Sequence, residues 1–161
     1  MGTSLGVEDL VLEKVFMILK YIYSERMDMI YRHNIDQLIM CTLFACCKCL
    51  KSNIDFKDII EKYTDINAYN KDDHNNIVYK ITQKGHQEGD KTMDLIKYYN
   101  LVFVIELKPA ITVIVKDTYE QNFGGNALLH KTLKEVLPRD LKRNALKPAK
   151  DQNPNLLRSI T

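Results

Sequence analysis

Four cysteines and four histidines are the side chains of this sequence best suited to act as nucleophiles, bases or metal ligands. The cysteines are Cys41, Cys46, Cys47 and Cys49, and only Cys46 and Cys49 have the Cys-x-x-Cys spacing. They lie in an apolar segment with helical periodicity. This pattern favours small buried residues of a packed helix over a metal site, a redox pair or a disulfide framework. We therefore expect a reducing compartment and neither a metal nor another cofactor.

The histidines do not fall into a catalytic pattern. His33, His74, His86 and His130 are absent from any Gly-x-Ser-x-Gly or His-Glu-x-x-His motif, and the chain contains no glycine-rich phosphate-binding motif. No nucleophile, base and stabilising group can be assigned together from the sequence. We expect a protein that is not an enzyme.

Polar side chains inside two apolar helical segments indicate a different chemistry. Phe44 and Lys48 are four residues apart and share a helical face, with Cys49 beside them. A second face carries residues at spacings of three, four and seven: Ile96, Tyr99, Asn100 and Phe103. A buried tyrosine or asparagine needs a hydrogen-bond partner. That partner is either a neighbouring loop or the backbone of an extended peptide, for which an amide supplies both a donor and an acceptor.

Helical periodicity positions these residues. Apolar residues recur at spacings of three and four residues from Glu8 to about Arg32, which predicts one amphipathic helix. Its stripe is widened by Phe16, Tyr21 and Tyr23, which indicates burial on more than one side. Asn34, with Gln37 three residues later, is typical of a capping box that starts a second helix. That helix is apolar nearly all round, so we expect it at the centre of the domain.

Further helices are expected along the rest of the first 109 residues. Asn53 is the expected cap of a third helix, residues 64–76 are expected to form a loop, and a shorter helix is expected over 76–83. A long helix from Met93 to Leu107 should end at Lys108-Pro109, because proline inside a helix removes a backbone hydrogen bond. Five helices with short connections and almost no strand signal predict an all-α bundle.

The last third of the chain has a different composition. Ile111 to Val115 is a β-branched run that could be one short strand or an extended segment. Gly124-Gly125 is an expected hinge before a helix that ends at Pro138. Residues 138–161 carry six Lys or Arg and two Asp or Glu, which predicts a mobile basic tail. We thus expect a domain over 1–109, an extension over 110–137 and a tail over 138–161.

Charge and hydropathy limit the surroundings of the protein. The formal net charge is +2, which is too small to predict direct nucleic-acid binding. The longest apolar run, in residues 38–47, is too short to span a bilayer, and the first residues do not have the pattern expected of a signal peptide. We expect no membrane association.

Two stretches, in the same order, resemble the B box of retinoblastoma proteins. The first extends from Met29 to Tyr63 and contains the sequence IDQLIMC at 35–41, then Lys48, then Phe56-Lys57. The second extends from Asp94 to Phe103 and contains a Tyr-Asn-x-Val-Phe motif at 99–103. The resemblance covers about Leu10 to Lys108. It implies a cyclin-like bundle of about five helices with a less ordered C-terminal extension, in a nuclear regulator of transcription and the cell cycle.

The resemblance also implies a shallow groove for extended peptides of the L-x-C-x-E type. Tyr99 and Asn100 would bond the peptide backbone. The apolar pockets would be lined by Ile96, Phe56 and the side chain at Cys49, and three lysines would favour an acidic peptide from around the groove: Lys48, Lys57 and Lys108. Phe44 stands where the family usually has tyrosine, so one hydroxyl contact to the peptide is missing.

The partners implied by the resemblance are proteins that carry such a peptide, for instance chromatin-modifying co-repressors. The sequence contains no counterpart of the family's A box. We therefore expect either a fragment of a longer protein or a lone B-like box, with exposed apolar surface that associates with an A box or with a second copy. Cell-cycle transcription factors would bind only where an A box is present. The alternatives are a cyclin-type or general transcription-factor box, or a scaffold with a vestigial groove.

Overall fold

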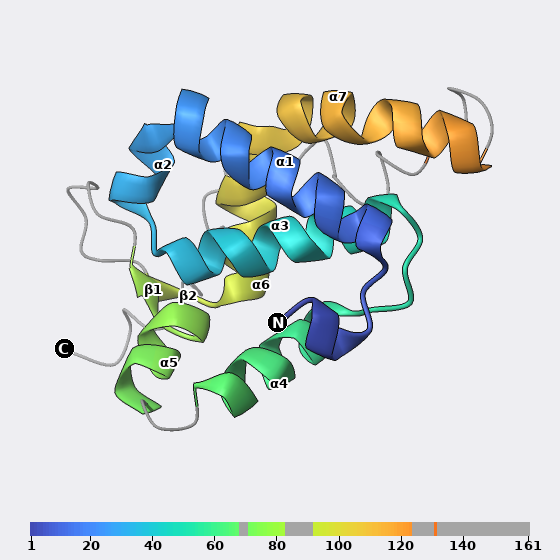
Figure 1. Cartoon of the computed structure of the whole chain (residues 1–161). Helices are drawn as coiled ribbons and strands as arrows, with labels where there is room; N and C mark the ends of the chain where they lie inside the picture. Colours follow the sequence, from blue (N-terminus) through green and yellow to red (C-terminus); the bar gives the residue numbers. More distant parts are fainter. Residues whose placement is uncertain (68–70, 83–91, 124–130, 132–161) are drawn as a thin grey trace, which may run out of the picture.

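A computed structural model of the chain describes residues 1–67, 71–82, 92–123 and 131. In chain order the elements are η1 (Thr3–Leu5), α1 (Asp9–Glu25), α2 (Met27–Arg32), α3 (Ile35–Cys49), α4 (Phe56–Ile66), α5 (Lys71–Val78), β1 (Ile81–Thr82), β2 (Thr92–Met93), α6 (Leu95–Tyr98), the π-helical turn η2 (Tyr99–Phe103) and α7 (Val104–Phe123). Apart from one pair of very short strands, the regular elements of the described residues are helices (Figure 1). The expected all-α, cyclin-like fold class is confirmed.

Helix α3 lies at the centre of the bundle, where it contacts α1, α4, α5, α7 and η2 (Figure 1). It begins in the predicted capping box: the Asn34 side chain accepts a hydrogen bond from the backbone N–H of Asp36 at 2.8 Å, and Gln37 Oε1 accepts from the Asn34 N–H at 3.3 Å. Its four cysteines are all buried and unbonded, as expected for small residues of a packed helix.

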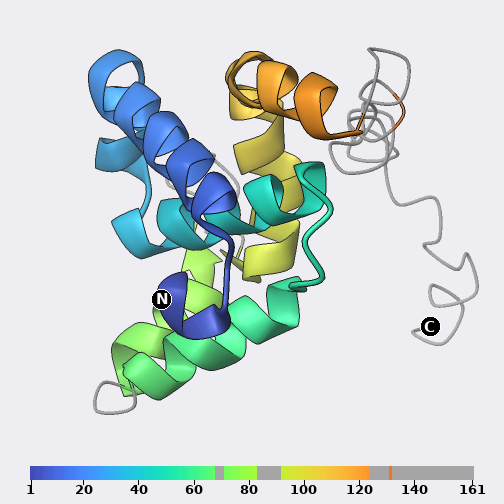
Figure 2. The same cartoon turned by 45° about the vertical axis from the view of Figure 1, so that its right-hand side comes forward.

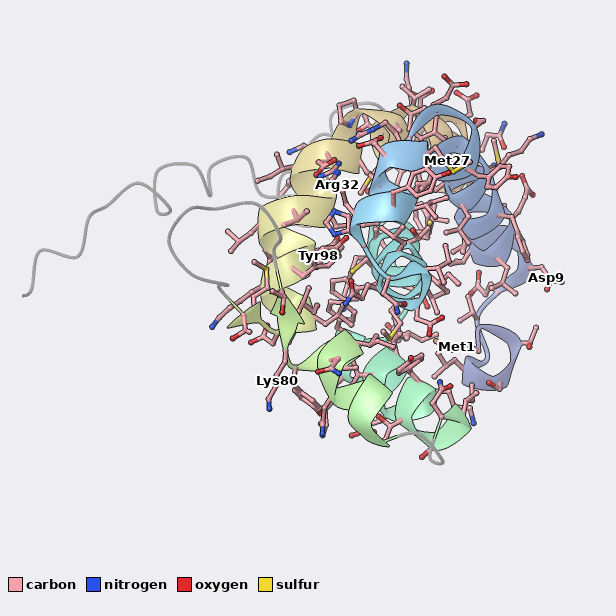
Figure 3. All side chains as sticks on the ribbon, turned by 90° about the vertical axis from the view of Figure 1, so that its left-hand side faces the viewer. Met1, Asp9, Met27, Arg32, Lys80 and Tyr98 are labelled. Atoms are coloured by element: carbon pink, nitrogen blue, oxygen red, sulfur yellow. The ribbon has the colours of Figure 1, made fainter. Side chains whose placement is uncertain are left out.

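The predicted N-terminal helix is broken in two, because Arg26 leaves the helical conformation (φ −132°, ψ 42°) between α1 and α2. At this break the Arg26 guanidinium donates to both carboxylate oxygens of Asp28, at 3.0 and 3.2 Å, and forms an ion pair with Glu106 of α7. Arg32 donates to both oxygens of the same Glu106, at 3.1 and 2.8 Å. Figure 3 shows Arg32 between α2 and the helix of residues 95–123. The break thus allows two arginines to tie α2 to α7.

This ion network changes the protonation of Glu106. Partial burial alone would raise the pKa of Glu106, but the hydrogen bonds from Arg32 and Arg26 outweigh it and lower the pKa below the usual value. The carboxylate is therefore ionised at neutral pH, as the two arginines require.

One face of α1 is buried and the other is exposed. Val11, Ile18 and Ile22 are at most 1 % exposed, whereas Phe16 is 70 % and Tyr23 is 66 % exposed. The expectation that the aromatic residues widen the buried stripe is therefore wrong for Phe16 and Tyr23. Only one stripe of α1 faces the helices against which it packs, α3 and α7.

The segment after α3 contains more regular structure than the sequence predicts. Asp55, and not Asn53, caps α4, and the expected loop over 64–76 is mostly occupied by the end of α4 and the start of α5. The shorter helix, expected from residue 76, begins at residue 71. Strands β1 and β2 pair antiparallel, with Ile81 opposite Met93. Strands of two residues are too short to produce an alternating pattern in the sequence.

Helices α6 and α7 and the turn η2 form one continuous helix over residues 95–123, capped by Asp94, whose side chain accepts from the Lys97 N–H at 2.8 Å. Pro109 lies inside α7, so the expected helix end at Lys108-Pro109 is wrong, as is the strand considered at 111–115. Ile111, Val115 and Tyr119 are 0 % exposed. Burying such side chains contributes about 1.5–3 kcal/mol each, which together exceeds the cost of about 3 kcal/mol for an internal proline.

The continuous helix runs through the boundary expected between residues 109 and 110. It is also long and apolar enough to cross a membrane, judged by length and composition only, which core helices of soluble proteins satisfy as well. Here α7 packs against α1 and α3. The expected hinge at Gly124-Gly125, the helix after it and the basic tail over 138–161 lie outside the described residues.

Candidate functional site

Three aromatic rings from three separate elements meet at the C-terminal half of α3. Phe44 of α3 and Phe56 of α4 stack with ring centroids 4.5 Å apart and an interplanar angle of 8°. Tyr99 of η2 meets both rings edge-on, at 5.0 Å from Phe44 and 5.6 Å from Phe56. We call these three residues the ring cluster. The structure thus brings together three of the residues that the sequence singled out for peptide binding.

Lys48 places a positive charge beside the ring cluster. One turn after Phe44 on α3, its ammonium lies 5.5 Å from the centroid of the Phe44 ring, within cation–π range. The same ammonium forms an ion pair with Asp55, the residue that caps α4. The Lys48 side chain is 31 % exposed and that of Asp55 is 70 % exposed, so the pair lies at the surface.

Asp55 was not predicted as a site residue. It stands three residues before Asp58, whose side chain accepts from the Asp55 N–H at 2.7 Å in a capping box. Recognition of this capping pair in the sequence would have placed Asp55 at the start of α4. Its pairing with Lys48 depends on how α3 and α4 pack, which no local pattern predicts.

The Tyr-Asn pair occupies the start of a π-helical turn, Tyr99–Phe103. Such turns are rare and are frequently found at functional sites. The Asn100 side chain donates to the backbone oxygen of Ile96 at 3.0 Å, and an amide group has in addition a second N–H and a carbonyl oxygen with which to meet a peptide backbone. Asn100 is partly exposed and Ile96 is 52 % exposed, so both lie at the surface.

The deeper residues of the site are enclosed. Phe56 is 6 % exposed, Tyr99 is 2 % exposed and Cys49 is 0 % exposed. Cys49 was expected to line a pocket, but in this structure its thiol lies below the surface, and burial raises its pKa to about 12. Burial also raises the pKa of Tyr99 far above its usual value, so its phenol stays protonated.

The two remaining lysines of the expected groove are placed differently. Lys57 follows Phe56 in the first turn of α4, is well exposed, and lies 3.4 Å from a carboxylate oxygen of Glu61. Lys108 is half-buried, about two turns beyond Asn100 on the continuous helix. Lys57 therefore adjoins the ring cluster, whereas Lys108 is removed from it along the helix.

Metal chemistry receives no support from the described part of the chain. There, no three or more His, Cys, Asp or Glu side chains come together in a way that could hold a metal ion. What the site offers instead is aromatic and aliphatic surface, an asparagine amide and lysine ammonium groups. These groups suit a peptide with apolar and acidic side chains.

Comparison with known proteins identifies relatives of this chain. The family model for the retinoblastoma-associated protein B domain matches residues 1–108. Retinoblastoma-related protein 2 of Oryza sativa subsp. japonica is 26 % identical over 101 residues, which are 63 % of this chain and 10 % of that protein. Retinoblastoma-related protein of Cocos nucifera is 26 % identical over 103 residues, which are also 63 % of this chain and 10 % of that protein.

A wheat relative extends the match slightly. Retinoblastoma-related protein 1 of Triticum aestivum is 24 % identical over 124 residues, or 73 % of this chain and 13 % of that protein. The chain therefore spans about a tenth of the length of the curated relatives that it matches.

Proposed function

Because this chain belongs to the retinoblastoma-associated protein B domain family, we propose that it is a protein-interaction module that binds extended peptides of the L-x-C-x-E type at the ring cluster. On this proposal it acts by binding and not as an enzyme, within a nuclear pocket-type regulator of transcription and the cell cycle. The peptide specificity, the partners and the nuclear location are all part of the proposal.

The observation that carries the proposal is the placement of Lys48 and Asn100 around the ring cluster. An extended peptide lying over this surface would place apolar side chains against the half-buried Phe44 ring and against Ile96. Its backbone would meet the Asn100 amide, which can donate and accept at once. An acidic side chain would be attracted to Lys48, mainly through steering and contacts at the rim.

The half-buried Phe44 should make this groove weaker than one with tyrosine at the same position. Its ring already takes part in the stack with Phe56, so a hydroxyl on it would not need a new ring orientation. A neutral hydrogen bond of the kind that is missing contributes about 0.5–1.5 kcal/mol, or at most about tenfold in affinity. The binding should therefore be weakened but not lost.

Further partners follow from the exposed face of α1. Phe16, Met17 and Tyr23 present apolar side chains to solvent there, at 70, 43 and 66 % exposure. Large apolar side chains exposed on one helix are candidates for an interface. We propose that an A-type box or a second copy packs on the domain, and that cell-cycle transcription factors bind only when an A-type box is present. Chromatin-modifying co-repressors that carry an L-x-C-x-E peptide are the proposed groove partners.

The proposal is tested by fluorescence polarisation with a labelled L-x-C-x-E peptide and the full chain. Asn100→Ala should weaken binding at least about fivefold, because it removes backbone contacts worth about 1 kcal/mol or more. Asn122→Ala is the matched control: Asn122 lies on the same continuous helix and donates in the same way to the oxygen four residues earlier, at 2.9 Å, but lies outside the site. It should bind like the wild type.

Two outcomes contradict the proposal. Equal losses in Asn100→Ala and Asn122→Ala would attribute the effect to the helix and not to the groove. If neither the wild type nor Phe44→Tyr bound the peptide, the alternative of a scaffold or an ordinary cyclin-type box would replace the proposed function.

A further inference from the structure

A second surface depression lies at the other end of α3. It is a pocket of about 410 Å³ between the start of α3, the end of α4 and α5. Helices α4 and α5 lie at the bottom of Figure 2, below α3. Its lining is dominated by side chains that form hydrogen bonds: Asn34, Asp36, Gln37, Tyr63, Asn67, His74 and Asn76, with Ile77. None of these residues belongs to the ring cluster or to the groove around it.

The walls of this pocket are held in place by their own hydrogen bonds. Tyr63 donates its hydroxyl to Asp36 Oδ2 at 2.9 Å, and Gln37 Nε2 donates to the backbone oxygen of Ile77 at 3.2 Å. Asn67 Nδ2 donates to the backbone oxygen of Tyr63 at 3.0 Å. Asp36 Oδ1 and Asn67 Oδ1 are two acceptor atoms of the lining that take no part in these three bonds. The pocket thus has a fixed shape and offers acceptors to a ligand.

Two flat rings, those of Tyr63 and His74, are part of the lining. The rings of Tyr63 and His74 lie 5.9 Å apart with an interplanar angle of 20°, and Tyr79 meets His74 edge-on at 5.7 Å. The His74 ring is held by Thr64, whose hydroxyl lies 2.7 Å from Nε2. A flat cationic group can stack on such a surface.

The electrostatics of the pocket favour a cation. Among the described residues that line the pocket, Asp36 is the one carboxylate, and none is a lysine or arginine. The positive N-terminal end of α3 stabilises the charge on Asp36, two residues into that helix. Asn67 caps the C-terminal end of α4, the negative end of that helix.

We propose that this pocket binds the guanidinium group of an arginine side chain carried by a partner protein. A guanidinium is planar, always charged and carries five N–H donors. Those donors match the oxygens of Asp36 and Asn67, and its plane matches the stacked rings. The side-chain amides of Asn34 and Asn76 also line the pocket and are the groups proposed to meet the backbone that flanks the arginine. A lysine ammonium carries the same charge but fits the stacked rings less well. This inference is independent of the proposed function.

The experiment is an NMR titration of the full chain with N-acetyl-arginine amide, followed through backbone amide signals. N-acetyl-citrulline amide has nearly the same shape without the charge and serves as the matched ligand. Arginine should give saturable shifts at Asp36, Asn67 and His74, with an affinity at least about fivefold above that of citrulline, because charge-assisted hydrogen bonds are about twice as strong as neutral ones. Equal affinities, or shifts that do not saturate, would overturn the proposal.

Two variants locate the effect. Asp36→Asn removes the charge but keeps an acceptor for the Tyr63 hydroxyl, and should abolish the preference for arginine over citrulline. Asn76→Asp adds a second carboxylate at an exposed pocket residue, and should strengthen arginine binding severalfold. Because Asn76 is exposed, this variant keeps the test valid even if Asp36→Asn fails to fold.

Asn75→Asp is the control for added charge. Asn75 is also exposed on α5 but does not line the pocket. It should leave arginine binding nearly unchanged. If Asn75→Asp strengthened binding as much as Asn76→Asp, the attraction would be a general surface effect and the pocket would not be the site.

Discussion

The two ends of α3 present opposite chemistry. At its C-terminal end, the ring cluster and Lys48 form an apolar surface with a positive charge at its edge. At its N-terminal end, Asp36 lies in a pocket lined mainly by amides. Both charges also suit the helix, because acidic residues are favoured at a helix N-terminus and basic residues at its C-terminus. The positions of Asp36 and Lys48 therefore stabilise α3 and also suit its N-terminal end to a cationic ligand and its C-terminal end to an anionic one.

The two ends also differ in how they are held together. Ring packing holds the C-terminal end, and it draws on α4 and the π-helical turn as well as α3. Hydrogen bonds between side chains and the backbone hold the N-terminal end. We therefore expect substitutions to act mainly on hydrophobic packing at one end and on single polar contacts at the other.

The largest expected difference is in stability. Phe56→Ala should lower the free energy of unfolding by about 3–5 kcal/mol, because Phe56 is 6 % exposed and packs on two other rings. Asn76→Ala, at the exposed rim of the other end, should change it by less than about 0.5 kcal/mol. Urea denaturation measures both. Similar values for the two variants would show that the ring cluster is not packed as described.

The cap of α3 should have the next largest effect. Asn34→Ala removes the side chain that accepts from the Asp36 N–H and should cost about 1 kcal/mol, within a range of about 0.5–2. Asn34→Asp retains an acceptor and should unfold close to the wild type in the same denaturation experiment. An equal loss in both variants would mean that the amide contributes something other than the cap.

A smaller effect is expected for Phe44→Tyr in peptide binding. The added hydroxyl should strengthen binding of an L-x-C-x-E peptide by about 0.5–1.5 kcal/mol, measured by fluorescence polarisation. Phe16→Tyr adds the same hydroxyl on the exposed face of α1 and should not change the affinity. A gain in affinity from both variants, or from neither, would show that Phe44 does not contact the bound peptide.

The smallest expected effect concerns Asp55, whose carboxylate pairs with Lys48 and would compete with an acidic peptide for that ammonium. Asp55→Asn removes the carboxylate that pairs with Lys48 but keeps a residue able to cap α4. Exposed ion pairs contribute about 0.2–1 kcal/mol, so an acidic peptide should bind at most about fivefold more tightly. The same peptide with glutamine in place of its glutamate should show no gain. A gain with both peptides would exclude competition for the charge.

Local sequence patterns were sufficient for α3 and for the class of fold. The Asn34 and Gln37 capping pair and the apolar composition of 35–49 predicted where this helix begins and that it is buried. The spacing of Ile96, Tyr99, Asn100 and Phe103 predicted one helix for all four, but only Ile96 and Asn100 reach its surface. These features depend on neighbours within one or two turns, so the sequence carries them directly.

What only the tertiary structure decided depends on contacts between distant residues. The helix of residues 95–123 continues through Pro109 because Ile111, Val115 and Tyr119 are buried in the bundle. The N-terminal helix breaks at Arg26, where two arginines reach Glu106. The pairing of Lys48 with Asp55 and the amide-lined pocket likewise require α3, α4 and α5 to be packed together. Propensity costs of a few kcal/mol are outweighed when several side chains are buried at once, and no local pattern records that burial.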